Sequence, residues 1–383
     1  MNSRFGTNVI SILSLAVLWE VTGRIMAPFD REVSLALESK LAPLADAVVA
    51  RQMARMPELA RRYGAAGQQK CLQDTRYHLR YLAQAIWLAN NALFTDYVAW
   101  VGDMLEARRI PREHLVTHLR YMADTMEEIL PKEVAAAVCD FINTALSQLP
   151  PTPVEHATAI ADSEPLAGLA KKYLKLLLNG DRHGASRLVL DSAAAGTDVK
   201  DIYLYVFQSC QYEIGRLWQM NKITVAQEHY CTAATQVIMA QFYPHIFGSV
   251  KSGYRFVAAS VAGELHEMGP RMICDFLELA GWDTHYLGAN TPADGILQMV
   301  LERDPHILGL SATLGFHVRE IEQMIAAVRS TDRCKNLKIM VGGAPFNKQR
   351  DLWRQIGADG SALNAAETVR IAETLVKSLN SVT

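Results

Sequence analysis

The chain has 383 residues, half of them hydrophobic, and a formal net charge of −2. This length is sufficient for two or three domains, each with its own hydrophobic core. The near-neutral charge gives no overall attraction to nucleic acid or to anionic lipid, so we expect neither DNA nor a membrane as a direct partner.

The six cysteines are scattered along the chain, without the close spacing typical of zinc sites and redox motifs. We therefore expect free thiols in a cytoplasmic protein, because the cytoplasm keeps thiols reduced. An apolar run at residues 9–19 is too short to span a bilayer, and it is followed closely by charged residues. We expect it to form a core helix rather than a signal peptide or membrane anchor.

Residues 1–150 contain only helical patterns. Apolar residues recur at three- and four-residue steps through residues 79–105, and the segment 110–131 begins and ends near prolines. The sequence therefore predicts an all-α domain. Residues 149–165 contain four prolines and little periodicity, so we predict a linker over residues 151–165.

Two further patterns follow the linker. Residues 166–250 hold about four helices separated by short loops, which favours an antiparallel four-helix bundle. In residues 251–383, short β-rich runs alternate with amphipathic helices. This alternation predicts a flavodoxin-like, doubly wound parallel sheet of about five strands, a Rossmann-like fold. The fold class is thus multidomain α and α/β.

Ligands of such a sheet bind at the carboxyl ends of the strands, where the strand order reverses. No glycine-rich phosphate loop follows the first strand, which disfavours a dinucleotide. A polar loop with a solvated histidine is the simpler interpretation of residues 264–269 taken alone. Seven polar residues and glycines stand at or just after the predicted ends of strands one, three and four: Glu264, His266, Gly269, Ser311, Thr313, Gly342 and Gly343.

This set resembles the cobalamin-binding domain of corrinoid proteins, which holds B12 with Asp-x-His-x-x-Gly, Ser-x-Leu and Gly-Gly motifs. The resemblance implies that His266 is the lower axial ligand of cobalt in a base-off, His-on complex, oriented by Glu264. A neutral imidazole is a good metal ligand, and a carboxylate on its second nitrogen fixes its tautomer. Two departures are that Glu264 replaces the aspartate and that Leu314 comes one residue late after Ser311.

The bundle contains Trp218 and, after nine intervening residues, the pair Glu228 and His229. A core tryptophan and a surface pair are the ordinary interpretation. The spacing is similar to the helical cap of adenosylcobalamin-dependent light-sensing repressors, and the resemblance implies that the three residues enclose the 5′-deoxyadenosyl group. Those repressors carry a histidine directly after the tryptophan, whereas this chain has Gln219, so we do not expect the same capture of cobalt after photolysis.

The domain order resembles the photocobilins, which fuse a globin-like bilin-binding domain to a B12 domain. This resemblance implies that residues 1–150 bind biliverdin noncovalently. A linear tetrapyrrole needs an aromatic slot, partners for its N–H groups and cations for its propionates. A packed core with a solvated arginine face is the alternative for every candidate. The candidates are His78, Arg76, Arg80, Tyr81, Tyr97 and Trp100.

The leading hypothesis is a light sensor that binds adenosylcobalamin and biliverdin as chromophores. Light would break the Co–C bond and change the domain arrangement or the oligomeric state. The alternatives are a corrinoid methyl carrier of a methyltransferase system and a B12-responsive protein-interaction module. No nucleophile–base constellation suggests catalysis by the chain itself, so we expect a sensor or regulatory protein acting through an unidentified downstream protein or through self-association. No helix-turn-helix precedes the bundle, so the DNA-binding arrangement of the repressors is not expected.

Overall fold

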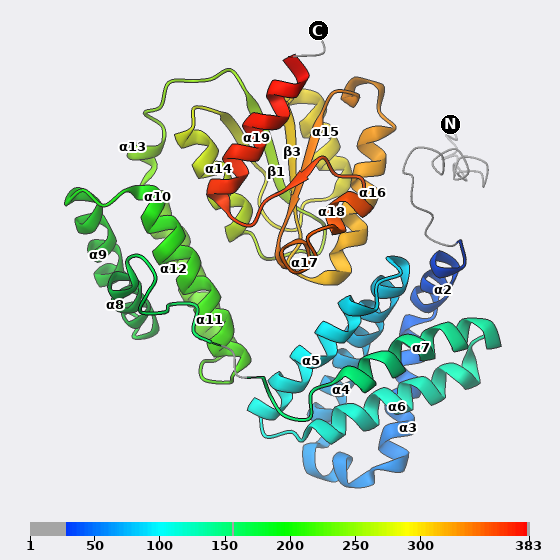
Figure 1. The fold of residues 1–383 in the computed structure, drawn as a ribbon. Helices are drawn as coiled ribbons and strands as arrows, with labels where there is room; N and C mark the ends of the chain where they lie inside the picture. The colour runs from blue at the N-terminus through cyan, green and yellow to red at the C-terminus, as the bar shows by residue number, and fades with distance from the viewer. Residues whose placement is uncertain (1–27, 155–156, 381–383) are drawn as a thin grey trace, which may run out of the picture.

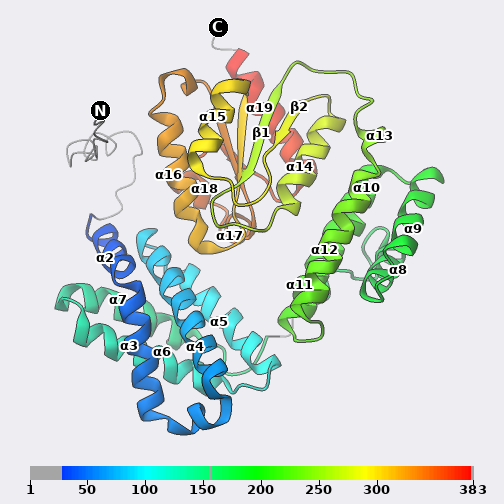
Figure 2. The same ribbon diagram turned by 180° about the vertical axis from the view of Figure 1, so that it is seen from behind.

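The computed structural model describes residues 28–154 and 157–380. The helix predicted at residues 9–19 lies outside them. Figures 1 and 2 show three parts: an N-terminal group of helices, a separate helical bundle, and a sheet covered by helices on both faces. This arrangement confirms the predicted fold class.

The N-terminal domain is built from helices whose apolar faces meet in one core. Leu82, Ile86, Phe94, Leu119 and Ile142 are fully buried there, which explains the three- and four-residue periodicity of the sequence. Its helices are α2 (Pro28–Ser39), α3 (Leu41–Arg55), α4 (Pro57–Trp87), α5 (Asn91–Ala107), α6 (Arg112–Ile129) and α7 (Lys132–Gln148).

The bundle contains one long helical rod that changes its winding midway. In that rod, a π-helical segment, η1, connects α10 to α11 without a break. Thr224 begins the last long helix with a capping box, because its hydroxyl accepts from the Gln227 N–H and the Gln227 side chain accepts from the Thr224 N–H. The elements are α8 (Ala167–Leu178), α9 (Arg182–Ala194), α10 (Val199–Asp201), η1 (Ile202–Gln208), α11 (Ser209–Gln219) and α12 (Val225–Ala240). The short helix α13 (Tyr243–Ile246) leads from the bundle into the sheet domain.

All five strands of the sheet are parallel, in the order β2-β1-β3-β4-β5. This is the predicted flavodoxin-like order. The order reverses between β1 and β3, where Ser260 pairs with Ser311 at the carboxyl ends. The strands are β1 (Arg255–Ser260), β2 (Asp283–Tyr286), β3 (Ile307–Ser311), β4 (Lys338–Gly342) and β5 (Gly360–Ser361).

Helices cover both faces of the sheet (Figure 1). Residues of α14 and α19 pack with strand residues in one core cluster, and residues of α15, α16 and α18 pack with the opposite strand face in another. Helix α14 begins at Met268, so Gly269 lies in its first turn and not in the loop where the sequence pattern placed it. Pro270 suits such a first turn, because it has no N–H that would need a partner. The helices are α14 (Met268–Leu279), α15 (Ala293–Arg303), η2 (Gly315–His317), α16 (Val318–Arg329), η3 (Asp332–Cys334), α17 (Ala344–Lys348), α18 (Leu352–Gln355) and α19 (Ala365–Asn380).

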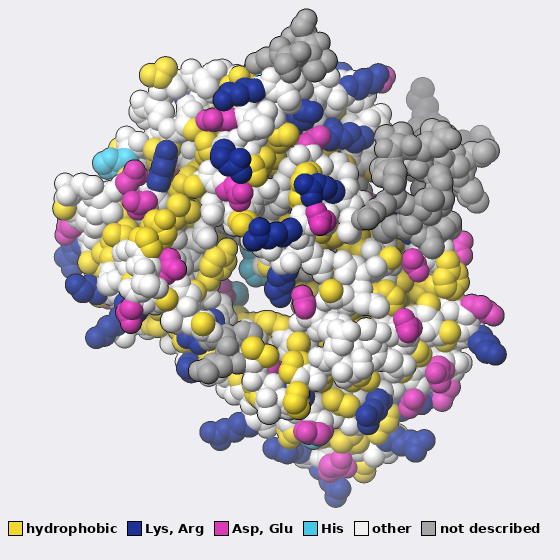
Figure 3. Space-filling view, viewed as in Figure 1, with side chains coloured by type: hydrophobic (Ala, Val, Ile, Leu, Met, Phe, Trp, Pro, Cys, Tyr) yellow, Lys and Arg dark blue, Asp and Glu magenta, His cyan; other side chains and the backbone are white. Residues whose placement is uncertain are grey.

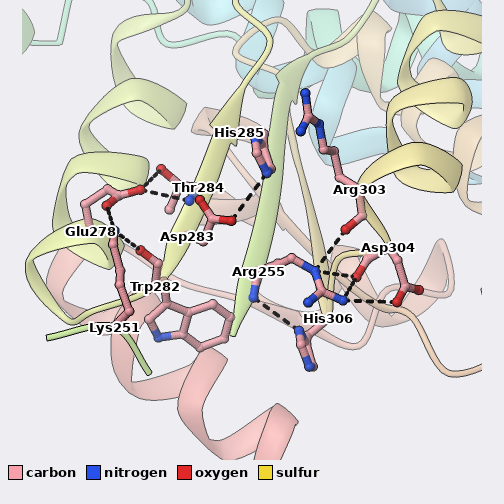
Figure 4. A network of polar contacts seen from close by, with 10 residues as sticks. All are labelled: Lys251, Arg255, Glu278, Trp282, Asp283, Thr284, His285, Arg303, Asp304 and His306. Carbon is pink, nitrogen blue, oxygen red and sulfur yellow. Dashed lines mark hydrogen bonds and ion pairs between the residues drawn. The ribbon is translucent and has the colours of Figure 1, made fainter. Parts of the chain in front are cut away.

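Polar contacts fix the amino ends of the strands (Figure 4). The Arg255 guanidinium donates to the main-chain carbonyls of Arg303 and Asp304 and to the Asp304 carboxylate. The buried Glu278 carboxylate accepts from the Lys251 ammonium and from the Thr284 N–H. These contacts join the amino ends of the strands to the neighbouring helices and loops.

The N-terminal domain packs against the sheet domain. The Trp87 indole N–H donates to Glu322 on α16, and the Arg319 and Arg31 guanidinium carbons lie 4.1 Å and 4.8 Å from the centroid of the Trp87 ring. Arg31 also pairs with Glu322 at 3.0 Å. Cation–π contacts and a shared carboxylate therefore hold the two domains together.

All six cysteines are free; five are buried and Cys71 is partly buried. Among the described residues, no helix has both the length and the apolar character needed to cross a membrane.

Candidate functional site

The centre of the candidate site is the carboxylate of Glu264, which is completely buried just after β1. Its Oε1 accepts from the N–H and from Nδ1 of His266, at 2.9 Å and 2.5 Å. Its Oε2 accepts from the N–H groups of Thr313 and Leu314, at 2.6 Å and 3.2 Å, and from Nδ1 of His317 at 3.1 Å. Burial alone would raise the pKa of Glu264, but the hydrogen bonds from His266 and His317 hold it far below its usual value. The carboxylate is therefore permanently ionised.

The carboxylate determines the orientation of the His266 ring. Nδ1 faces Glu264, which leaves Nε2 for another partner, and the side chain is 58% exposed. The hydrogen bond to Glu264 raises the pKa of His266 despite partial burial, and the charge of Glu228 adds to this effect. Such a ring, oriented by a buried carboxylate and open at Nε2, fits an axial ligand of a metal.

Two glycines at the end of β4 differ in what surrounds them. A Cβ on Gly342 would have no atom within 4 Å, so the missing side chain leaves open space at the carboxyl edge. Gly343 has a φ of 112°, and a Cβ there would lie 1.9 Å from the carbonyl oxygen of Ala312. Gly269 also faces open space. Gly343 is therefore required by the fold, whereas Gly342 and Gly269 leave room for a ligand to approach the backbone.

A hollow lies among the bundle, the sheet domain and the N-terminal domain (Figure 3). In the bundle, the Glu228 carboxylate pairs with His229 Nδ1 at 2.5 Å and accepts from the Thr232 hydroxyl at 3.2 Å. The His229 side chain is 75% exposed. Glu228 and His229 thus pair with each other on the bundle surface, and the charge of Glu228 raises the pKa of His266.

Trp218 contacts the N-terminal domain. Its ring stacks with the Trp100 ring at 6.0 Å, and the guanidinium carbon of Arg108 lies 5.3 Å from its centroid. Arg108 also donates to the carbonyl oxygens of Trp218 and Gln219, at 3.2 Å and 2.9 Å. These carbonyls lie at the C-terminal end of α11, where the helix dipole favours a cation. Trp100, predicted for the bilin pocket, and Trp218, predicted to enclose the adenosyl group, therefore contact each other.

The other N-terminal candidates divide into a buried set and an exposed set. Nδ1 of buried His78 hydrogen-bonds the Tyr97 hydroxyl at 2.8 Å, and Tyr97 stacks on Tyr81 at 3.7 Å. Arg76 and Arg80 are exposed on α4. The aromatic residues and His78 come together, whereas the two arginines lie on the solvated face.

The sequence prediction missed His118, which lies 5.3 Å from His78 between ring centroids. Its Nδ1 hydrogen-bonds Gln52 at 2.6 Å and its Nε2 hydrogen-bonds Thr75 at 3.2 Å. Burial lowers the pKa of His118 to about 4 and, together with the neighbouring imidazole, lowers that of His78 far below its usual value. Both rings are neutral at pH 7.

The thiol of Cys71 lies 3.4 Å from the Gln52 side-chain oxygen. Burial, followed by the charge of Asp74, raises the pKa of Cys71 to about 11. A thiol that stays protonated at pH 7 is a weak nucleophile, so this environment does not favour bond formation to a ligand.

Two further groups near His266 carried no sequence signal. His317 reaches Glu264 across 53 positions in the chain, from the turn after β3. Glu267 accepts from Gln236 of α12 at 2.8 Å and from the Tyr286 hydroxyl at 3.1 Å, which ties the bundle to the loop after β1. Periodicity identifies faces of helices and strands, but it does not identify such contacts between elements.

Three protein-family models match the chain, each over a separate segment. A B12 binding domain model matches residues 254–371, and a second B12 binding domain model matches residues 169–243. A phycobilisome protein model matches residues 32–149.

A dimethylamine corrinoid protein of Methanosarcina acetivorans is 28% identical over 170 residues, which cover 43% of this chain and 77% of that protein. Another, from Methanosarcina mazei, is 29% identical over 166 residues, or 43% of this chain and 74% of that protein. The solved structure of the monomethylamine corrinoid protein of Methanosarcina barkeri has a TM-score of 0.50 at 21% identity and covers 55% of this chain and 100% of that chain. This last likeness shows a shared fold.

The segments matched by the two B12 binding domain models contain the bundle and the sheet, so the dyad of Glu264 and His266 lies within a B12 binding domain match. The chain therefore joins a region similar to phycobilisome proteins to two regions similar to B12 binding domains, and these matches support a corrinoid as its cofactor.

Proposed function

We propose that this chain binds a corrinoid between the carboxyl edge of its sheet and the helical bundle, with Nε2 of His266 as the lower axial ligand of cobalt. The single observation that carries the proposal is the buried Glu264 carboxylate, which takes Nδ1 of His266 and leaves Nε2 directed elsewhere. Open space at Gly342 and Gly269 supports the approach of a large ring to this edge.

The chain's own residues have distinct tasks in this complex. Glu264 keeps a proton on Nδ1 of His266, so that Nε2 offers a lone pair. The N–H groups of Thr313 and Leu314 donate to Oε2 of Glu264 and hold its carboxylate in position. When bound, a corrinoid would supply a cobalt atom that can accept and release an alkyl group. Ser311, at the end of β3, lies beside Ser260 of β1, where it would line the path of the corrin's tail.

The experiment that tests the proposal replaces His266 with alanine. We expect affinity for hydroxocobalamin to fall at least tenfold, and the visible spectrum of the remaining complex to lose the signature of histidine coordination. Titration followed by absorbance measures both. A variant that binds with unchanged affinity and spectrum would exclude His266 as the ligand.

We infer, as the first candidate for the biological role, a corrinoid carrier that passes methyl groups within a methyltransferase system. The relatives named as dimethylamine corrinoid proteins support this role. A carrier of this kind is not itself an enzyme, and its partner is a methyltransferase. Methylcobalamin in the purified protein, and its demethylation when a thiol and a partner methyltransferase are added, would support this role.

The second candidate is a light sensor with adenosylcobalamin and biliverdin. The observation that favours it is the phycobilisome protein match at residues 32–149, together with the contact of Trp100 with Trp218. His78, Tyr81 and Tyr97 would line the bilin slot, Arg76 and Arg80 would reach the propionates, and Trp218, Glu228 and His229 would enclose the adenosyl group. Illumination of protein loaded with both pigments should change its absorption spectrum and release the adenosyl group.

The two roles predict opposite results with one sample. A sensor binds biliverdin in an equimolar titration and changes its elution volume on illumination, whereas a carrier binds no tetrapyrrole other than its corrinoid and keeps its elution volume. Loss of the alkyl group under light does not separate the two roles, because the Co–C bond of every alkylcobalamin is light-sensitive. Unchanged elution in size-exclusion chromatography before and after illumination would count against the sensor, because its output requires a change of domain arrangement or oligomeric state.

A further inference from the structure

A second imidazole meets the buried carboxylate of Glu264. His317 is 5% exposed, and its Nδ1 lies 3.1 Å from Oε2, while His266 occupies Oε1. A carboxylate held through both oxygens cannot rotate about its terminal bond without breaking a hydrogen bond. His317 therefore helps to determine where Oε1, and with it the His266 ring, is directed.

The turn that carries His317 is held by the N-terminal domain. Phe316 packs edge-on against Tyr81 at 5.1 Å and stacks with Tyr77 at 6.2 Å, both on α4. The Arg80 guanidinium carbon lies 6.0 Å from the centroid of the same ring. Phe316 in turn packs edge-on against His317 at 4.4 Å.

The backbone on both sides of His317 leaves little freedom. A Cβ on Gly315 would lie 3.2 Å from Cε1 of Tyr81, so α4 closely approaches this turn. A Cβ on Gly263 would lie 3.0 Å from Nε2 of His317. The imidazole is thus enclosed between the loop after β1 and a turn that contacts another domain.

We propose that His317 is a positioning residue for the lower cobalt ligand, and that helix α4 of the N-terminal domain holds it in place through Phe316. This inference rests on the proposed corrinoid site at His266. It gives the N-terminal domain a contact path to the cobalt ligand, through Tyr81, Phe316, His317 and Glu264. Movement of α4 would then alter the strength of the bond between His266 and cobalt.

Three variants test the path at different points. His317→Phe removes the donor but keeps a ring, His317→Gln keeps an amide donor, and Phe316→Ala removes the contact with α4 without touching the carboxylate. The control is His183→Phe, at an exposed histidine on α9. Each protein is loaded with cob(II)inamide, which lacks the benzimidazole nitrogen of cobalamin, and electron paramagnetic resonance measures the fraction that shows nitrogen splitting from an axial histidine. Absorbance titration gives the affinity for hydroxocobalamin.

For His317→Phe we expect roughly a tenfold loss of affinity and a larger fraction without histidine coordination, since removal of a group that orients a ligand typically costs 10- to 100-fold. The loss should lie near the lower end of that range, because two N–H groups still bind Oε2. His317→Gln should restore most of the splitting. Phe316→Ala should shift both measurements in the same direction by less, and the control should match the parent protein.

The results separate this inference from the proposed function. If His266→Ala abolishes the nitrogen splitting while His317→Phe and Phe316→Ala match the parent protein, the inference is wrong and the proposed ligand stands. If His266→Ala keeps the splitting, the proposed ligand is wrong. Thermal melting of each protein without corrinoid checks folding, and a poorly folded His317→Phe leaves the decision to His317→Gln and Phe316→Ala.

Discussion

Asp275 of α14 lies at the contact between the bundle and the sheet domain and is 5% exposed. The Tyr203 hydroxyl of the π-helical segment η1 donates to it at 2.9 Å. Burial raises the pKa of Asp275 to about 6, although the bond from Tyr203 and the charge of Arg271 act in the opposite direction. The folded protein thus retains a proton on a group that is ionised in the unfolded chain at the same pH.

This shift predicts how stability depends on pH. Because the folded pKa is above the unfolded value of 3.8, the stabilising contribution is complete below about pH 4 and is lost as the pH rises through about 6. Asp275→Asn keeps the shape and removes the titration. We expect the variant to gain about 2–3 kcal/mol over the parent above pH 7 and little near pH 4. Urea unfolding at several pH values measures this, and a constant difference across the range would contradict it.

Gly342 and Gly343 are adjacent at the end of β4, and the same substitution at each should have different effects. Gly343→Ala should destabilise the protein without corrinoid by about 2 kcal/mol or more, because its backbone has a positive φ and the new Cβ would clash with the Ala312 carbonyl. Gly342→Ala should leave that stability within about 0.5 kcal/mol, since its Cβ meets nothing within 4 Å, but it should weaken corrinoid binding. Denaturant unfolding and cobalamin titration separate the two effects. Equal losses of stability in both variants would contradict this account.

The strands and helices were predictable from the sequence, whereas contacts between distant elements were not. Alternating β-rich runs and helices predicted the sheet, because strand burial and parallel crossovers leave a strong pattern. The contact of Glu264 with His266 was implied by the resemblance to corrinoid proteins, and the structure contains it. The contact of His317 with Glu264 was not predicted, because the approach of His317 depends on the turn after β3 and on a domain contact that no local pattern records. The contact between Trp100 and Trp218 joins two domains and was hidden for the same reason.

For the whole molecule, Trp87 is one of the links between the N-terminal domain and the sheet domain. It is 9% exposed and lies between two guanidinium groups. Trp87→Ala should loosen this contact, because truncating a buried tryptophan typically costs about 3–5 kcal/mol. We expect a larger radius of gyration in small-angle scattering and faster proteolysis of the linker between the helical parts.

A suitable control is Trp353→Ala, since Trp353 contacts the guanidinium of its neighbour Arg354 within α18. That variant should keep the compact scattering profile. If Trp87→Ala also keeps it, other contacts of the N-terminal domain, such as that of Arg108 with Trp218, are sufficient to hold the arrangement.

The state of the six cysteines has a practical consequence. Five are buried, and burial raises the pKa of Cys71 to about 11. Alkylating reagents attack thiolates, so the native thiols should react slowly at neutral pH. A cysteine engineered onto an exposed surface would then take up a fluorescent or nitroxide label selectively, and pairs of such labels would report inter-domain distances in solution without prior removal of the native cysteines.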